Sequence, residues 1–369
     1  MSGADPGTRA GAVLTVDRGA IAANYGLLRA RLGGAECAAV VKADAYGLGA
    51  AEVAPTLARA GARWFFVAHL QEGVALRAVL PADARIAVLN GIWQGLEDDF
   101  RAHDLLPVLN DLGQVALWSA RARAEGRPLP AVVHADTGMS RLGLPPGEVA
   151  VLADEPARLA GVEVALVMSH LACADEPDHP LNALQLERFR AARRIAPAAH
   201  ASLAASSGIF LGPDWHFALA RPGVALYGVN PTPHLDNPMR PVVRLEARIL
   251  QVRRIDPGES VGYGAAHRAG RPTKVATIPI GYADGFLRSA SLRTSFLVGG
   301  RSVPVLGRVS MDLITIDVSD LPDDAARPGT PVVVIGDERT LDAVAADAGT
   351  IGYEMLTGLG ARYRRVYAG

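Results

Sequence analysis

The segment Ala38-Ala-Val-Val-Lys42-Ala-Asp-Ala-Tyr46-Gly-Leu-Gly49 decides the fold of this chain. Its first residues, small and β-branched, are typical of a buried parallel strand, and the glycines that follow indicate a turn into a helix. Lys42 lies at the carboxyl end of this strand, where burial of an ammonium group is costly unless the group has a function. The alternative is a lysine that extends its ammonium from the strand end into water.

The scarcity of lysine separates these two interpretations. The chain has 37 Lys plus Arg residues, of which only Lys42 and Lys274 are lysines. An arginine supplies charge and hydrogen bonds, but it stays protonated and cannot trap an aldehyde as an amine. We therefore favour a Schiff-base role for Lys42.

The composition indicates a soluble enzyme of the cytoplasm. A length of 369 residues predicts two domains, and 50% hydrophobic residues suit large cores. A net charge of −1 gives no reason to expect a nucleic-acid or membrane partner. The two cysteines, Cys37 and Cys173, are too few for a disulfide framework. Met1–Gly7 has no apolar core after a basic start, so no secretory signal is expected, and no apolar run is long enough to span a bilayer.

Short apolar runs alternate with amphipathic helical stretches between Cys37 and Gly228. This pattern favours a (β/α)8 TIM-type barrel over an open doubly wound sheet, which stays an alternative. The fourth run contains Pro107, and the seventh is short. The eight candidate strands are residues 40–42, 64–67, 86–89, 105–108, 131–134, 162–167, 200–202 and 223–226.

The pattern changes after residue 235. We predict a barrel domain over residues 1–235 and a mostly antiparallel β domain over residues 236–369, with residues 11–16 as a candidate strand for the second domain. Asp17 is a plausible N-cap of the helix that follows it. A helix is expected at residues 341–348. The candidate strands of the second domain lie within residues 242–254, 274–278, 303–306, 313–316 and 332–335.

Several polar residues fall on loops at the carboxyl ends of the barrel strands, where the active sites of such barrels lie. Ser206-Ser207-Gly208 could bind a phosphate, although an ordinary helix cap is the simpler interpretation. Asp136 and Arg141 could equally form a surface turn with a local ion pair, and a lone His170 is more often structural. No cluster has metal-ligand spacing. The loop residues are Lys42, Asp136, Arg141, His170, Ser206 and Ser207, and Arg221 is expected just before the eighth strand.

Seven segments, in order and across both predicted domains, resemble those of the alanine racemase family. They are Val41-Lys-Ala-Asp-Ala-Tyr-Gly47, Asp136-Thr-Gly-Met-Ser-Arg-Leu-Gly143, Arg221-Pro-Gly-Val-Ala-Leu-Tyr-Gly228, Ser260-Val-Gly-Tyr-Gly264, Ile280-Gly-Tyr-Ala-Asp-Gly285, Leu306-Gly-Arg-Val-Ser-Met-Asp312 and Tyr353-Glu354.

The resemblance implies a pyridoxal 5'-phosphate enzyme that interconverts L- and D-alanine through an external aldimine, to supply or consume D-alanine for the cell wall. It makes Lys42 the cofactor lysine and one catalytic base, and Tyr263 the other base on the opposite face of the substrate. Arg141 would contact both the cofactor and the substrate carboxylate, and the backbone of Met311 would contact that carboxylate too. The other cofactor-binding positions would be Tyr46, His170, Ser206, Arg221, Gly223, Val224 and Tyr353.

A chemical reason supports the position of Arg221, which the resemblance pairs with the pyridine nitrogen. A guanidinium only donates hydrogen bonds, so this nitrogen would stay unprotonated and the ring would be a weaker electron sink. A short-lived carbanion suits racemisation. Two bases on opposite faces are needed because a single base would return the proton with retention.

The resemblance further implies a homodimer in which each Tyr263 enters its partner's active site. It also implies a narrow route to the cofactor, so alanine should be preferred over larger amino acids. The supporting and gating positions would be Asp312, Tyr282, Tyr353, Cys173, Asp175, Arg288 and Arg308.

Three positions depart from the family pattern. Leu48 replaces a frequent histidine, and Ala205 replaces an asparagine before the phosphate-binding serine. His134 stands where many members carry a carbamylated lysine, an anionic group that imidazole cannot reproduce.

Three other functions are compatible with parts of the pattern. A broader-specificity racemase on the same fold is often exported, and the missing secretory signal argues against one. A decarboxylase of the same architecture is disfavoured by the segments around Tyr263 and Met311, and a non-catalytic cofactor carrier would lack the second domain.

Overall fold

The computed structural model describes residues 10–369, so the segment Met1–Gly7 lies outside the described residues. The chain forms two compact units. One comprises Ile21–Arg240, and the other comprises Pro241–Gly369 together with the N-terminal segment up to Ala20. No helix in residues 10–369 combines the length and the apolar character needed to cross a bilayer.

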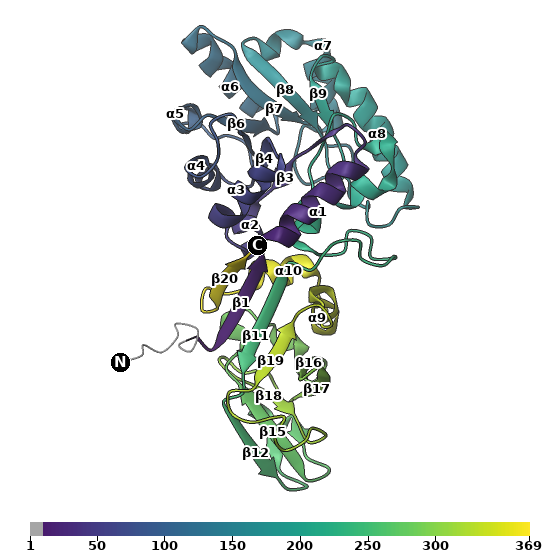
Figure 1. Ribbon diagram of the computed structural model, residues 1–369. Helices are drawn as coiled ribbons and strands as arrows, with labels where there is room; N and C mark the ends of the chain where they lie inside the picture. Colours follow the sequence, from purple (N-terminus) through teal and green to yellow (C-terminus); the bar gives the residue numbers. More distant parts are fainter. Residues whose placement is uncertain (1–9) are drawn as a thin grey trace, which may run out of the picture. The chain divides into compact units, whose positions relative to one another are not determined.

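The first unit contains a parallel sheet whose seven strands follow the chain order β3 to β9. An eighth strand, β10 (Leu219–Ala220), pairs with β2 (Glu36–Cys37) directly before β3. On its other side, Ala218 N–H donates to Ala201 O and Arg221 N–H donates to Ala204 O, next to β9. These bonds close the sheet, and the predicted (β/α)8 barrel is confirmed. Figure 1 shows the helices of this unit around strands β3 to β9. The sheet strands are β3 (Ala39–Val40), β4 (Trp64–Val67), β5 (Arg85–Val88), β6 (Leu105–Leu109), β7 (Leu129–His134), β8 (Val162–Met168) and β9 (His200–Ser202).

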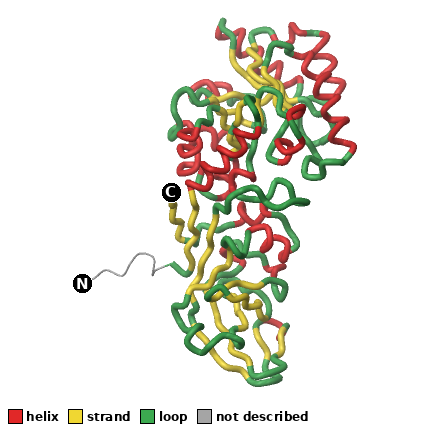
Figure 2. Tube along the Cα trace, turned by 45° about the vertical axis from the view of Figure 1, so that its right-hand side comes forward, coloured by secondary structure: helices red, strands yellow, loops and turns green. Residues whose placement is uncertain are grey.

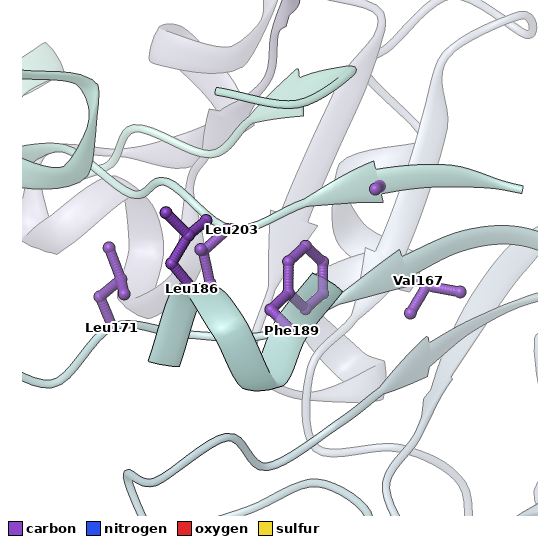
Figure 3. Packing of buried hydrophobic residues seen from close by; sticks show 6 residues of the cluster. Val167, Leu171, Leu186, Phe189 and Leu203 are labelled. Carbon is purple, nitrogen blue, oxygen red and sulfur yellow. The ribbon is translucent and has the colours of Figure 1, made fainter. Parts of the chain in front are cut away.

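Helices alternate with these strands, as Figure 2 shows in red and yellow. Asp17 caps the first of them, because its Oδ1 accepts a hydrogen bond of 2.9 Å from Ala20 N–H. The last long helix, α8, buries Leu186 and Phe189 against Val167 of β8 and Leu203 after β9 (Figure 3). The helices are α1 (Arg18–Arg31), α2 (Lys42–Gly47), α3 (Ala50–Ala60), α4 (Leu70–Arg77), α5 (Glu97–Ala102), α6 (Leu112–Glu125), α7 (Pro146–Asp154) and α8 (Pro180–Ala192).

The eighth strand was predicted at residues 223–226, and this was wrong. Val224–Tyr227 is a 3-10 helix, and the strand lies four residues earlier at Leu219–Ala220. The N–H groups of Gly223 and Ala225 donate to the Ser206 hydroxyl rather than to a neighbouring strand. The apolar run is therefore buried as a 3-10 helix beside Ser206 and not as a sheet strand. Arg221 consequently follows the eighth strand instead of preceding it.

The second unit is built on a nine-stranded sheet in the order β12–β15–β18–β17–β16–β19–β11–β1–β20. All its pairs are antiparallel except β1 with β20. Strand β1 (Ala12–Asp17) lies between β11 and β20. The remaining strands are β11 (Val243–Arg248), β12 (Gln251–Ile255), β15 (Thr273–Ile278), β16 (Ser295–Val298), β17 (Arg301–Leu306), β18 (Ile314–Asp317), β19 (Pro331–Ile335) and β20 (Arg364–Ala368). A hairpin, β13 (Ser260–Val261) with β14 (His267–Arg268), and two helices, α9 (Leu341–Ala348) and α10 (Gly352–Gly358), complete the unit.

Candidate active site

Lys42 opens a left-handed turn at the carboxyl end of β3. The next four residues, Ala43 to Tyr46, have φ between 52° and 56°. Such a conformation costs L-residues about 1–2 kcal/mol each, so neighbouring groups must hold it. Glu72 accepts a hydrogen bond of 2.6 Å from Ala43 N–H, and Asp44 accepts one of 2.7 Å from Ala50 N–H. The turn leaves the Tyr46 ring only 7% exposed.

The surroundings of Lys42 favour its neutral amine. Burial lowers the pKa of Lys42, the positive charge of Arg141 lowers it further, and the carboxylate of Glu72 opposes both. Because only a neutral amine is a nucleophile, a lowered pKa suits a lysine that condenses with a carbonyl group.

Tyr46, Ser206, Gly223 and Val224 come together as a small cradle. The hydroxyl of Ser206 accepts hydrogen bonds of 3.0 Å from Gly223 N–H and 3.2 Å from Ala225 N–H. It makes no cap bond to the 3-10 helix that begins at Ser207, so the helix-cap interpretation is wrong. A Cβ at position 223 would collide with the hydroxyl of Tyr46. Hydroxyl and amide groups around a bare backbone are suited to phosphate oxygens.

Arg221 is buried, with 3% of its surface exposed, and it is held by neutral groups. Its guanidinium donates to Ser169 O at 2.5 Å and to the Ser202 hydroxyl. No described carboxylate lies within ion-pair distance of it. Burial lowers the pKa of Arg221 to about 10, so it remains a cation at neutral pH. A buried cation without an acid is suited to a neutral acceptor such as an unprotonated ring nitrogen.

Arg141 lies on a loop that is stabilised by hydrogen bonds within the loop. Asp136 accepts hydrogen bonds from the N–H groups of residues 138, 139 and 140 at 2.9–3.2 Å. Leu144 closes the loop by donating to His134 O at 2.7 Å and accepting from Asp136 N–H at 2.9 Å. The alternative of a local ion pair is wrong, because no described acid pairs with Arg141 within 4.0 Å. The loop therefore presents a guanidinium available to an anion.

His134, the departure from the family pattern, is a neutral side chain. Asn110 donates its Nδ2 to Leu89 O and Val108 O, so its Oδ1 must accept, at 2.8 Å, from His134 Nδ1. Burial lowers the pKa of His134 to about 3, and Arg221 and Arg141 add to this while Asp136 opposes it. His134 thus carries its proton on Nδ1 and keeps Nε2 as an acceptor.

His170 is also neutral. Burial lowers its pKa well below the ordinary value, and the positive charges of Arg221 and Arg141 contribute next. A neutral imidazole is suited to packing beside an aromatic ring. The predicted cofactor-binding residues of the barrel unit thus fall into two groups. Lys42, Arg141, His170 and Arg221 lie close enough for their charges to influence one another, and Tyr46, Ser206, Gly223 and Val224 form the cradle.

In the second unit, Tyr263 stands on an exposed turn. It is 71% exposed between Gly262 and Gly264. Cβ atoms at these two glycines would lie 3.6 Å from Arg308 N and 3.0 Å from Arg308 Nη1. Ser291 joins the segment of Arg288 to that of Arg308, since its hydroxyl donates to Arg288 O and accepts from Val309 N–H at 2.9 Å.

Met311 and Asp312 continue this region of the second unit. Met311 O accepts from Ala283 N–H at 3.0 Å, beside Tyr282, and no described residue accepts from Met311 N–H. Arg362 bridges Asp312 at 2.7 Å and Asp284 at 3.0 Å. Tyr353 is 40% exposed at the start of α10.

Sequence reasoning missed several residues that hold these groups in place. Glu72, Gln185 and Arg362 lie on helices or near the chain end and carry no strand-end signal. Asp284 lies in the segment 280–285, where nothing in the sequence assigned it a role. In residues 10–369 no group of three or more His, Cys, Asp or Glu side chains is arranged to hold a metal ion.

The comparisons with known proteins agree with this geometry. Residues 16–231 match the family model described as "Alanine racemase, N-terminal domain", and residues 242–367 match "Alanine racemase, C-terminal domain". Alanine racemase of Rhodospirillum rubrum is 56% identical, over 98% of this chain and 97% of that protein. A catabolic alanine racemase of Agrobacterium fabrum is 52% identical, over 96% of this chain and 91% of that protein.

A solved structure supports the same conclusion. The crystal structure of alanine racemase from Bartonella henselae with covalently bound pyridoxal phosphate has a TM-score of 0.94 and 42% identity, covering 97% of this chain and 99% of that one. A barrel with a lysine at the carboxyl end of a strand, followed by a β domain and matched to these relatives, defines a two-domain barrel enzyme of amino-acid chemistry. The chain belongs to the alanine racemase family.

Proposed function

We propose that this protein interconverts L- and D-alanine with pyridoxal 5'-phosphate as its cofactor. The observation that carries this proposal is the convergence of Lys42, the Ser206–Gly223 cradle and the acid-free Arg221 in one barrel. Bound pyridoxal phosphate withdraws electrons from the α-carbon of the amino acid and so makes its proton acidic. Polarimetry tests the proposal: optical rotation of an L-alanine solution should fall to zero with enzyme and cofactor. A stable rotation would reject it.

The barrel residues would bind and orient the cofactor. Ser206, Gly223, Val224 and Tyr46, joined by Tyr353, would receive the phosphate at the cradle. Lys42 would hold the carbonyl carbon through its ε-amine. The Ser206 oxygen accepts hydrogen bonds from the N–H groups of Gly223 and Ala225. Its own O–H therefore remains available to donate to a phosphate oxygen, which supports this assignment.

Arg221 and His170 would lie at the ring. Arg221 would donate to the pyridine nitrogen and so keep it unprotonated, and the buried neutral His170 would pack beside the ring. By keeping this nitrogen unprotonated, Arg221 would weaken the electron withdrawal that the ring supplies, which favours racemisation. Transamination, which needs a longer-lived carbanion, would be suppressed.

The substrate carboxylate would be held by Arg141 and by the backbone of Met311. Both the guanidinium of Arg141 and the N–H of Met311 have no recorded acceptor in residues 10–369, which supports this role. Lys42 would then exchange the α-proton of D-alanine and Tyr263 that of L-alanine, from opposite faces.

The two-base assignment is tested by Tyr263→Phe, which removes only the hydroxyl. Racemisation should fall by at least about a hundredfold, the contribution of a positioned acid or base. Cofactor binding, followed by visible absorption, should be retained. Turnover close to that of the wild type would place the second base elsewhere.

We further propose a homodimer in which each Tyr263 serves the partner's Lys42. Tyr263 and Met311 are 71% and 52% exposed, although large apolar side chains gain by leaving water. A second copy would cover them. Mixing inactive Lys42→Ala with inactive Tyr263→Phe should restore part of the activity, because one site of each hybrid keeps both bases. No rescue despite demonstrated subunit exchange would contradict shared sites.

We place the protein in the cytoplasm, where a substrate amino acid is supplied. Cys37 and Cys173 are both free thiols, which a reducing compartment preserves. Fractionation of cells that express the full chain tests this location, and activity in the exported fraction would contradict it.

A further inference from the structure

We propose that Gln185, on helix α8, is a positioning residue that fixes Arg141, His170 and Arg221 as one unit, acting through Thr137 and Ser169. The inference rests on the proposed function, because it concerns the residues that would bind cofactor and substrate.

The amide of Gln185 is oriented without ambiguity. Its Oε1 accepts a hydrogen bond of 2.9 Å from Ala172 N–H. Its Nε2 donates to His170 O at 2.9 Å and to the Thr137 hydroxyl at 3.2 Å. The side chain is 0% exposed, so these three bonds satisfy it inside the protein. One amide therefore binds the backbone directly after His170 and the loop that carries Arg141.

The network continues from Thr137 to Arg221. The Thr137 and Ser169 hydroxyls lie 2.7 Å apart, and both residues are buried, 2% and 0% exposed. Ser169 in turn accepts from the Arg221 guanidinium through its carbonyl oxygen at 2.5 Å. The three cationic or aromatic groups come from three different loops of the barrel. This chain of hydrogen bonds connects them.

The backbone beside Thr137 rests on the same face of α8. A Cβ at Gly138 would lie 3.2 Å from Arg188 Nη1, 3.4 Å from Leu181 Cδ1 and 3.6 Å from Gln185 Cγ. Arg188 also donates to Thr137 O at 3.2 Å. Residues 181, 185 and 188 repeat at the helical spacing of one face. We call these three residues the α8 seat, since the Thr137–Gly138 turn lies on it.

The α8 seat is anchored in the apolar core of the barrel. Next to Gln185, Leu186 packs with Phe189 against the apolar core of β8 and β9 (Figure 3). Apolar burial thus fixes helix α8 to the barrel. The amide of Gln185 then joins this helix to the loop that carries Thr137 and Arg141. A buried amide that joins a rigid helix to a loop with a substrate-binding arginine limits how far that arginine moves, which preserves reactive geometry.

The test compares isosteric changes at Thr137 and Gln185. Thr137→Val removes the hydroxyl at nearly constant volume, while Thr137→Ser keeps it; Gln185→Met removes the amide. Ser119→Ala is the matched control, because Ser119 is 1% exposed and its hydroxyl donates one bond of 2.7 Å, to Ala160 O, outside the network of Gln185.

Two measurements decide the matter. Hydrogen–deuterium exchange of the amides at 138–140 should become about tenfold faster in Thr137→Val and Gln185→Met, the scale of one lost buried hydrogen bond, and remain as in the wild type in Thr137→Ser and Ser119→Ala. The KM for alanine should rise about tenfold in the same two variants, with a smaller change in kcat, since Arg141 binds the carboxylate.

Unchanged exchange and KM in folded Thr137→Val and Gln185→Met would overturn the inference, and so would equal effects in Thr137→Ser. The exchange measurement needs no turnover. If the wild type failed to racemise alanine, the proposed function would fall, while the exchange rates would still decide the role of Gln185.

Discussion

Glu72 accepts a hydrogen bond of 2.6 Å from the N–H of Ala43, the residue directly after Lys42. The other oxygen of this carboxylate accepts from Ala68 N–H at 2.7 Å and His69 N–H at 2.9 Å. One acid thereby joins the start of α4 to the left-handed turn. Its negative charge also opposes the lowering of the Lys42 pKa.

Glu72→Gln is expected to destabilise the protein by about 1–3 kcal/mol, because an amide cannot accept from three N–H groups at once. It should also lower the pKa of Lys42 further, since the opposing charge is lost. Urea denaturation and the pH dependence of amine labelling measure the two effects. Glu148 accepts a single bond of 3.1 Å, from Leu112 N–H, which a glutamine oxygen can still accept, so Glu148→Gln is the control and should leave the pKa of Lys42 unchanged.

Gly223→Ala should weaken cofactor binding. Its Cβ would meet the Tyr46 hydroxyl and lie 3.3 Å from Val40 Cβ, so the cradle must widen. We expect at least a tenfold rise in the dissociation constant, about 1.4 kcal/mol, measured by titration with pyridoxal phosphate. Gly26→Ala in α1, where a Cβ meets nothing within 4 Å, should leave binding unchanged. Equal affinities in all three proteins would contradict the cradle.

His134 predicts an acid-side loss of stability. Its pKa is about 3 in the fold and 6.5 when unperturbed. Below pH 6.5 the unfolded chain therefore binds a proton that the folded protein refuses, and stability falls as the pH drops from about 6.5 to about 3. One proton gives a slope of at most about 1.4 kcal/mol per pH unit.

The comparison is His134→Gln, with the exposed His200→Gln as control. Between pH 7 and pH 5, the wild type should lose about 2 kcal/mol more than His134→Gln in urea denaturation. His170, whose pKa is lowered as well, keeps part of the slope in every variant. Identical slopes in the wild type and His134→Gln would show that His134 is not buried neutral.

Borohydride reduction in the presence of cofactor should label Lys42. Lys274 is engaged elsewhere, with its ammonium 2.6 Å from Leu321 O and 3.0 Å from Asp323. Peptide mapping has only these two lysines to distinguish. A pyridoxyl group on Lys274, or on neither, would reject the assignment.

The substrate should be small. The resemblance surrounds the site with Tyr263, Tyr282 and Tyr353, beside Cys173, with Asp175, Arg288 and Arg308 farther out. One methylene is worth only about 1–3 kcal/mol in such a pocket, so serine should be a poor substrate and lysine and arginine nearly inert. Measuring kcat/KM in the wild type and in Tyr353→Ala tests this. Equal efficiency of wild type on lysine and alanine would favour a broader-specificity racemase.

Much of this arrangement was predictable from the sequence, because polar residues after buried strands meet at one end of a barrel. Lys42, Arg141, His170 and Ser206 carry that signal. The position of the eighth strand was not predictable, because Leu219–Ala220 has only two residues and the longer apolar run at 223–226 lies mostly in a 3-10 helix. The domain boundary at residue 235 stays a prediction.

The supporting residues were not predictable for a different reason. Gln185 lies in a helix among Leu and Arg residues, and nothing in its spacing tells that its amide is buried against His170. The left-handed turn after Lys42 likewise uses alanines, an aspartate and a tyrosine where glycine would be the usual signal. Tertiary hydrogen bonds decide both features.

The place of β1 has a consequence for synthesis on the ribosome. This strand is made first, yet one neighbour, β11, follows the whole barrel and the other, β20, comes last of all strands in the sheet. During translation β1 therefore has both edges unpaired, while the barrel can fold before the β sheet is complete. Nascent chains stalled before Arg364 should leave one edge of β1 open to a chaperone or to a neighbouring chain.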